Sequence, residues 1–295
     1  MNDRSKTDSG KALSTSNVES AMNELMPEIG RRRDTLSLLK VVLVGILISL
    51  TLKIFAFVLF DRNNEALPII DSFFPVFFRS QAVARVAYLL ACSGCLLAIF
   101  VTHKKHLVFA TLLVLVNVAI LTIHQSAYND VTFMCCSWAA LWCVWVATRL
   151  NESFESLFPR AVWLSHVILS LIFLGGAVGK VTEGYWSGQV LFDIYFEDRN
   201  FWFYNLFRAS LSAEQLREAA TWHSRMVIIS EFVCSFLWLM PAKMASAIAV
   251  VVLCGIALTN NFLLFSVVTC LIGLAIVGLH QPKSADAPKA FTDLG

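Results

Sequence analysis

The stretch AVWLSHVILSLIFLGGAVGK, residues 161–180, carries no acidic or basic side chain other than His166 before its final lysine. Twenty residues of α-helix extend about 30 Å, which matches the hydrocarbon thickness of a bilayer. A helix also satisfies its own backbone polar groups, as a lipid environment requires. The stretch therefore predicts a membrane-spanning helix with Lys180 at one end.

Seven further runs have a similar length and apolar character. They cover residues 38–60, 82–101, 107–123, 131–148, 225–241, 243–259 and 261–280. The last two are separated only by Thr259, Asn260 and Asn261, so they form either a hairpin or one broken helix. The predicted fold class is all-α: a polytopic membrane helix bundle of about eight spans.

The composition agrees with this class and excludes others. Of the 295 residues, 57% are hydrophobic and only 15% are charged, whereas about a quarter of the residues in soluble domains are charged. A net charge of +2, without zinc-finger spacing or a Gly-rich phosphate loop, argues against binding of nucleic acid. The histidines are scattered, so no metal site is expected.

The chain divides into a polar, disordered tail (1–37), a membrane domain (38–281) and a second tail (282–295). Basic residues are most frequent in cytoplasmic loops, and Arg31–Arg33 lie just before the first run. With this orientation both tails are cytoplasmic, and the expected location is the inner membrane of a bacterium.

The longest segment between two spans covers residues 180–224. Aromatic side chains alternate there with acidic and basic ones, which predicts short helices lying in the membrane interface. Ser212-Ala-Glu-Gln is a capping motif that should open the next helix. The shorter segment 66–78, with two prolines, is also expected to be interfacial or re-entrant.

Five polar side chains are predicted at one face of the membrane: Lys53, His124, Asp130, Lys180 and Glu231. Odd-numbered spans end, and even-numbered spans begin, on the same side, so this holds in either orientation. A charge in the hydrocarbon region costs several kcal/mol unless it is paired or reaches water. Clustering at one face therefore favours a functional site.

Each of these residues also has a structural interpretation. Lys53 can extend towards the headgroups, Lys180 can anchor a helix end, and His124 can cap one. Glu231 is too short to extend far, so it should pair with Lys53 or Lys180 or stay protonated. Cys92 and Cys95 form a C-x-x-C pair, which suits either a redox dithiol or a packing stripe of small residues.

A family resemblance follows from residues 120–245. The helix end Gly176-Ala-Val-Gly-Lys180, then Trp186-Ser-Gly188, then Glu231-Phe232 with Pro241, resembles the horizontally transferred transmembrane (HTTM) domain. That domain is the membrane part of vitamin K-dependent γ-carboxylases, and it is more distantly similar to DoxX-like proteins.

The resemblance implies a mechanism in which Lys180 acts as a base on a reduced quinone, supported by Glu231 and His124 as further catalytic residues. Substrate contacts would then come from Lys53, Asp130, Glu183 and Trp186. The carboxylases also carry a large extramembrane domain that holds a peptide, and no such segment is found in this sequence. A small or lipid-soluble substrate is therefore expected.

Three hypotheses remain open. The first is a quinol-dependent redox or proton-abstraction enzyme. The second is a small-molecule transporter component, with Lys53 and Glu231 as an intramembrane ion pair on its path. The third is a non-catalytic assembly or immunity partner. The expected partners are membrane lipid in every case, a quinone in the first, and another protein in the third.

Overall fold

The computed structural model describes residues 34–54, 73–127, 130–197, 202–259 and 262–280. Nearly all of these residues are helical, and no strand occurs among them. The predicted all-α, polytopic helix bundle is thereby confirmed.

Six helices among the described residues are long and apolar enough to cross a membrane. They are Asp34–Ile54, α2 (Gln81–Phe100), α3 (Lys104–Ile123), α4 (Val131–Thr148), α5 (Phe154–Lys180) and α10 (Ala242–Thr259). The protein is therefore an integral membrane protein, with α11 (Phe262–Ala275) and the 3₁₀ turn η7 (Ile276–Leu279) forming a shorter apolar helix.

The predicted count of about eight spans differs from these six at two places. The expected span 225–241 is divided, because α9 (Ala213–Cys234) ends at Cys234 and a 3₁₀ turn, η6 (Leu237–Leu239), follows. The first half of α9 is polar, with Glu214, Arg217 and Glu218 within its first two turns. The expected eighth span is the short helix α11, which packs against α10 as a hairpin partner.

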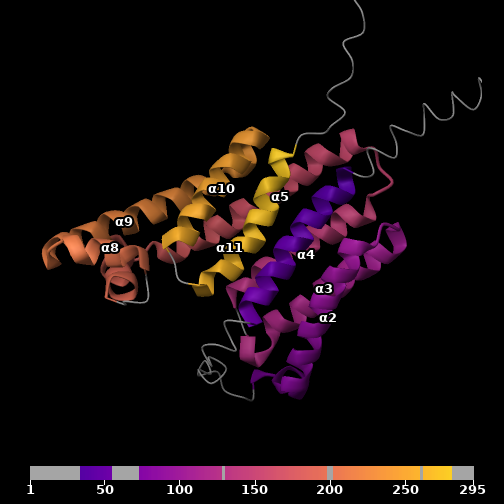
Figure 1. The fold of residues 1–295 in the computed structure, drawn as a ribbon, viewed down its shortest axis with the longest axis horizontal. Helices are drawn as coiled ribbons and strands as arrows, with labels where there is room; N and C mark the ends of the chain where they lie inside the picture. The colour runs from indigo at the N-terminus through magenta and orange to yellow at the C-terminus, as the bar shows by residue number, and fades with distance from the viewer. Residues whose placement is uncertain (1–33, 55–72, 128–129, 198–201, 260–261, 281–295) are drawn as a thin grey trace, which may run out of the picture.

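Short connections between these helices fix their arrangement. Three residues join α2 to α3 and five join α4 to α5, so each pair must run antiparallel. The helix Asp34–Ile54, indigo in Figure 1, lies among α2–α5 and α11. Trp142 is fully buried, and its Nε1 donates to the Ala161 carbonyl at 2.8 Å, which ties α4 to α5.

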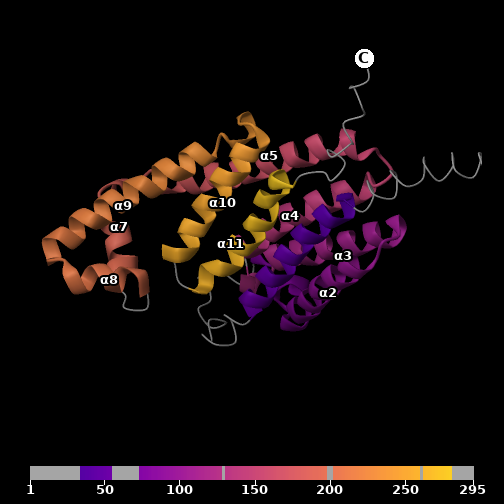
Figure 2. The same ribbon diagram turned by 45° about the horizontal axis from the view of Figure 1, so that its top comes forward.

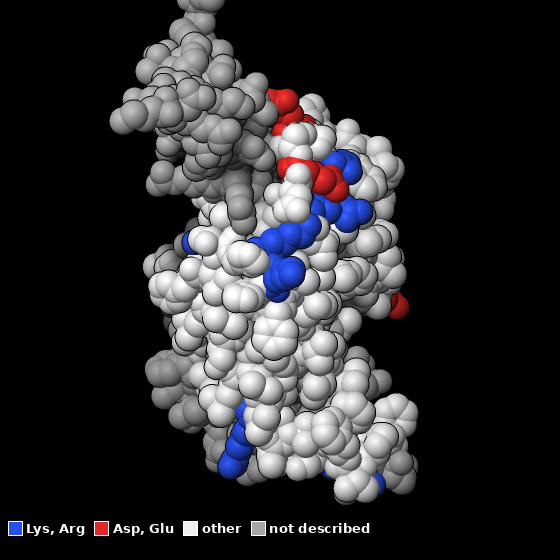
Figure 3. Space-filling model, turned by 90° about the vertical axis from the view of Figure 1, so that its right-hand side faces the viewer, with Lys and Arg blue, Asp and Glu red and all other residues white. Residues whose placement is uncertain are grey.

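The surface of this bundle suits a bilayer. Figure 3 shows the face at the α2 and α3 end of the molecule, where most charged side chains lie in the upper half, a few lie at the bottom edge, and the area between them is nearly uncharged. Large apolar side chains are exposed on every long helix, among them Leu89, Phe100, Phe109 and Val178. Lipid contact accounts for an apolar exterior of this extent.

The segment after α5 forms a separate helical unit. It contains α6 (Glu183–Trp186), α7 (Gln189–Leu191), the π-helical turn η5 (Phe192–Phe196) and α8 (Trp202–Ser210). We call these elements the platform. Leu191, Phe196, Tyr204 and Ala220 of α9 make its own small core. Figures 1 and 2 both place α8 and α9 at one end of the molecule and α2 and α3 at the other.

Several predicted boundaries shift or fall outside the described residues. The tail 1–37 overlaps a helix that already begins by Asp34, and residues 1–33 and 281–295 are not described. Of the expected interfacial piece 66–78, only its last residues are described, and Val76–Arg79 forms the 3₁₀ turn η3. The helix α5 begins at Phe154, seven residues before the predicted start.

Candidate functional site

Lys180 and Glu231 form an ion pair where α5 ends against α9. The lysine Nζ donates to both carboxylate oxygens, at 2.8 Å to Oε1 and 2.7 Å to Oε2. The Glu231 side chain is 10% exposed and that of Lys180 is 25% exposed. Of the two partners that the sequence offered to Glu231, the structure selects Lys180.

A glycine on α5 makes room for the carboxylate. A Cβ placed on Gly176 would lie 3.1 Å from Glu231 Oε2, closer than ordinary van der Waals contact. The Gly176 carbonyl also accepts from Lys180 Nζ at 3.4 Å. The Gly-x-x-x-Lys spacing therefore has a physical reason: the glycine sits one turn before the lysine and lets the glutamate approach the helix between them.

Three side chains of α9 hold the platform beside this pair. Ser224 Oγ donates to the Tyr185 carbonyl at 2.5 Å, Thr221 Oγ1 to the Ser187 carbonyl at 2.8 Å, and Arg225 Nε to the Trp186 carbonyl at 3.3 Å. These carbonyls belong to the end of α6, where a helix has no partners of its own for its last acceptors. Docking on α9 thus caps α6 and fixes its position.

Gly188 allows the platform to approach α9 so closely. Its φ of +80° lies in the left-handed region, and an added Cβ would lie 2.4 Å from the Thr221 Cα. The Trp186-Ser-Gly188 motif seen in the sequence therefore marks a backbone contact between α7 and α9. No residue with a side chain fits there without a shift of one helix.

One aromatic residue of the platform, Tyr195, lies near Glu231, and others lie on the outer surface. Burial raises the pKa of Tyr195 to about 12, and the neighbouring Tyr185 and Glu231 add to the rise. Arg225 contacts the rings of Trp186 and Trp222, with its guanidinium carbon 5.2 and 5.7 Å from their centroids. Trp186, predicted to bind substrate, is exposed and stacked on this arginine.

Glu183, the other predicted substrate residue of this segment, is exposed at the start of α6. Among the described residues its side chain makes no hydrogen bond or ion pair with Lys180. Its position at the first turn of a helix is favourable for a carboxylate, because the helix dipole is positive there.

Lys53 and Asp130 form a second ion pair, separate from the first. Lys53 Nζ lies 2.5 Å from Asp130 Oδ2, and Asp130 Oδ1 accepts from the Thr132 backbone N–H at 2.9 Å. Asp130 therefore caps α4 with one oxygen and binds the lysine with the other. The Lys53–Glu231 pair that the transporter hypothesis required is not formed, because each of its members has another partner.

His124 bonds to Ser126 and Ser80, and no bond to either ion pair is formed by its described contacts. Its side chain is fully buried; Nδ1 accepts from the Ser126 backbone N–H at 3.2 Å, which leaves Nε2 to donate to the Ser80 carbonyl at 3.0 Å. Both ring nitrogens are thus engaged in linking α3 to the start of α2. The five side chains expected to cluster are thus divided between two ion pairs and a separately bonded histidine, because a shared membrane face does not imply a shared side of the bundle.

The platform and α9 share a partly buried polar contact that the sequence did not indicate. Tyr204 on α8 and His223 on α9 are joined by a hydrogen bond of 2.9 Å between the tyrosine hydroxyl and Nε2. Burial lowers the pKa of His223 and raises that of Tyr204. Aromatic and histidine residues are common at interfaces, so no sequence signal distinguishes a buried pair from two surface residues.

The predicted redox pair shows the surroundings of a packing stripe. Cys92 is half-buried and Cys95 fully buried on α2, and both are free thiols, as are the other six cysteines. A Cβ on Gly94, between them, would lie 3.0 Å from the Val114 side chain of α3. The described residues contain no group of three or more His, Cys, Asp or Glu side chains arranged for a metal ion.

Compared with models of known protein families, with curated proteins and with solved structures, the chain matches none of them.

Proposed function

We propose that this integral membrane protein is an enzyme that abstracts a proton from a reduced quinone or a similar lipid-soluble alcohol, at the Lys180–Glu231 pair. The observation that carries the proposal is the position of this pair. It lies at the end of a spanning helix, against the platform. A lipid-soluble molecule in the bilayer can place its polar head group at this depth. The likeness to the HTTM domain is part of the same proposal.

The two residues have complementary roles in this chemistry. Lys180 must lose a proton before it can act as a base, and Glu231 at 2.7 Å is placed to receive that proton. The lysine, being the more exposed of the two, faces the arriving hydroxyl. Glu231 then stays near the ammonium that forms when Lys180 takes the substrate proton. A bound quinol would supply an acidic hydroxyl and, once deprotonated, two electrons for dioxygen as the oxidant.

The residues of the site fit such a head group. They offer one cation on α5, one carboxylate on α9 and, in the platform, the aromatic residues Tyr185, Trp186 and Tyr195. An aromatic side chain beside a planar ring, with a few polar groups to orient it, is typical of small-molecule sites. His124, Lys53 and Asp130 have no part in this proposal, since they stabilise the bundle elsewhere.

The test is quinol binding and oxidation by the purified chain in nanodiscs, comparing the natural protein with Lys180→Ala and Glu231→Gln. Lys53→Ala is the matched control, because it removes a paired lysine from the same membrane face. Turnover that is lost in the Lys180 and Glu231 variants but kept in the Lys53 variant supports the proposal. Equal activity in all four proteins, or no quinol binding by the natural one, contradicts it.

A non-catalytic partner role is the second candidate. It is favoured by the fact that Lys180 and Glu231 satisfy each other, as a structural pair would. In that case the same variants lower stability without changing any quinol signal. The location proposed for either role is a bacterial inner membrane, with both chain ends on the cytoplasmic side.

A further inference from the structure

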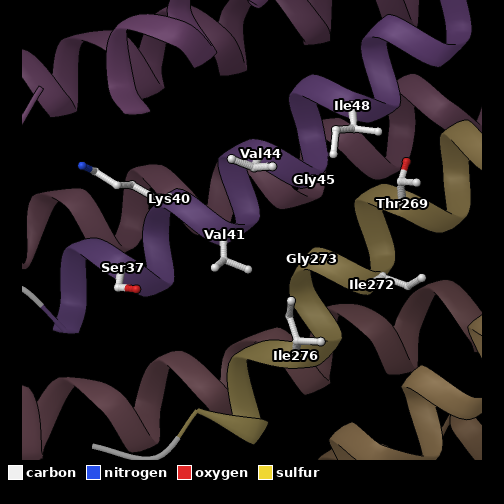
Figure 4. Close-up of a pocket in the computed structure, with 10 residues that line it drawn as sticks. All are labelled: Ser37, Lys40, Val41, Val44, Gly45, Ile48, Thr269, Ile272, Gly273 and Ile276. Carbon is white, nitrogen blue, oxygen red and sulfur yellow. The ribbon is translucent and has the colours of Figure 1, made fainter. Parts of the chain in front are cut away.

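A groove runs along the outer surface of the bundle between the helix Asp34–Ile54 and α11. Its volume is about 410 Å³, within the range of about 300–1,000 Å³ for ligand clefts. Figure 4 shows Ser37 and Lys40 at one end, and Ile48 and Thr269 at the other. Because these helices are membrane spans and a shorter apolar helix, lipid is the solvent on this side.

Glycines form the floor of the groove. A Cβ on Gly45 would lie 3.1 Å from the Thr269 carbonyl oxygen and 3.3 Å from the Gly273 Cα, so the two backbones nearly touch. Close backbone approach at small residues is typical of membrane helix pairs. The apolar side chains of Val44 and Ile276 stand on either side of this contact and make the walls.

The dimensions of the groove match one leaflet. From Ser37 to Ile48 the helix rises about 16 Å, and half of a hydrocarbon core of about 30 Å is about 15 Å. The Thr269 hydroxyl donates to the Phe265 carbonyl of its own helix at 2.9 Å, so it presents no unsatisfied donor to the groove. The walls are therefore suited to an acyl chain along their whole length.

The end near Lys40 has a different character. Among the described residues, Lys40 is the only charged one that lines the groove, and Ser37 lines the same end one turn earlier. Lys53 and Lys180 each pair with a carboxylate, whereas no carboxylate pairs with Lys40 among the described residues.

We propose that this groove binds one anionic phospholipid, with an acyl chain along Gly45 and Gly273 and the phosphate at Lys40 and Ser37. A basic side chain at the end of an apolar groove favours such a lipid over a zwitterionic one, whose headgroup also carries a positive charge. This site is independent of the Lys180–Glu231 pair, which lies at the opposite end of the spans.

The test is native mass spectrometry of the full chain in detergent, titrated separately with dioleoyl phosphatidylglycerol and dioleoyl phosphatidylcholine. We expect the anionic lipid to bind about fivefold more tightly, as one basic contact near a membrane surface provides. Lys40→Ala should remove that preference. Lys105→Ala is the matched control: an exposed lysine at the start of α3, outside the groove, whose loss should leave the preference unchanged.

Val44→Trp fills the groove and should reduce binding of both lipids, and Ile276→Trp does so from the opposite wall. Folding of each variant is checked by protection of the buried cysteines from a thiol reagent. Equal binding of the two lipids to the natural protein would overturn the proposal, as would an equal loss of preference in the Lys105 variant. Unchanged lipid binding with conversion of a dimer to a monomer in Val44→Trp would instead identify a contact between two copies.

Discussion

One lysine–carboxylate pair lies within the bundle and the other lies beside the platform, between α5 and α9, and the two pairs have different surroundings. In the bundle, Asp130 divides its oxygens between Lys53 and the first turn of α4, so the pair completes a helix cap. At the platform, both oxygens of Glu231 go to Lys180 alone. Asp130 is needed to cap α4, so the Lys53–Asp130 pair has a structural role. Glu231 makes no such cap, so the Lys180–Glu231 pair is the one available to react with a substrate.

The two regions are also held together in different ways. Apolar side chains and small residues pack the bundle, and its helices are joined by short loops. The platform depends on polar side chains of α9 that reach the backbone of α6. Single polar substitutions should therefore release the platform while the bundle stays folded, and the following experiments test this difference.

The largest effect is expected for Gly188→Ala. The added methyl group meets the Thr221 backbone at 2.4 Å, and the φ of +80° is unfavourable for alanine, so the cost should be about 3 kcal/mol or more. Trypsin should cut the platform faster. The cysteines of the chain all lie outside residues 181–212, so a thiol-reactive dye reports bundle melting separately and should show little change. Parallel losses in both readouts would show that platform and bundle fold as one unit.

Lys180→Ala should cost about 2–3 kcal/mol, below the range for a fully buried pair because the lysine is partly exposed. The loss arises from Glu231, which is left without its partner. The double variant Lys180→Ala with Glu231→Gln should regain part of the stability, as measured by thermal unfolding in detergent. Additive losses in the double variant would mean that the two side chains are not coupled.

Gly176→Ala and Gly179→Ala differ by one turn of α5 and should have opposite results. Alanine favours a helix over glycine by about 1 kcal/mol, and nothing lies within 4 Å of a Cβ at Gly179. At Gly176 the Cβ would lie 3.1 Å from Glu231, which cancels or exceeds that gain. The melting temperature should rise for Gly179→Ala only. A rise of the same size in both would indicate that Glu231 moves aside freely.

His223 should give the platform a pH dependence. Its pKa is lowered from the ordinary value of 6.5 by burial, so the folded state binds its proton less readily than the unfolded chain. Stability from this residue is complete above about pH 6.5 and decreases as the pH falls through the lowered pKa. His223→Gln can still accept from Tyr204 but does not titrate. Tryptic release of the platform should increase on acidification in the natural protein and much less in this variant.

The smallest effect is expected for Lys53→Ala. The cap of Asp130 on Thr132 persists without the lysine, so about 1 kcal/mol or less should be lost, which thermal unfolding can measure. A loss as large as that of Lys180→Ala would remove the distinction between the two pairs.

Most of the spanning helices could be predicted from the sequence, whereas the partners of individual polar side chains could not. The spans α2, α3, α4 and α10 follow from unbroken apolar runs, because lipid tolerates few exposed charges. The capping motif at Ser212 is present, with Gln215 bonded back to the Ser212 N–H at 3.0 Å. Such signals are local, and they depend only on residues near one another in the chain.

The remaining features depend on the rotation and tilt of whole helices. Counting spans places Lys53 and Glu231 at one face of the membrane, yet it cannot say which side of the bundle each helix presents. The packing of the helices sets this rotation, and as a result Lys53 pairs with Asp130 and Glu231 pairs with Lys180. Ser224 and Thr221 look like ordinary small helix residues in the sequence, so their role in holding α6 appears only in the structure.

The attachment of the platform also sets an order of events during synthesis. The carbonyls of Tyr185 and Ser187 leave the ribosome before the side chains that bind them, since Thr221 and Ser224 lie 34 and 39 residues later. At about 5–20 residues per second, this delay is roughly 2 to 8 seconds. Glu231 follows Lys180 by 51 residues, so Lys180 has emerged without its partner for roughly 3 to 10 seconds. The nascent chain therefore holds an unpaired lysine at the membrane surface until α9 arrives, which makes this the step at which an insertion factor or chaperone would be most useful.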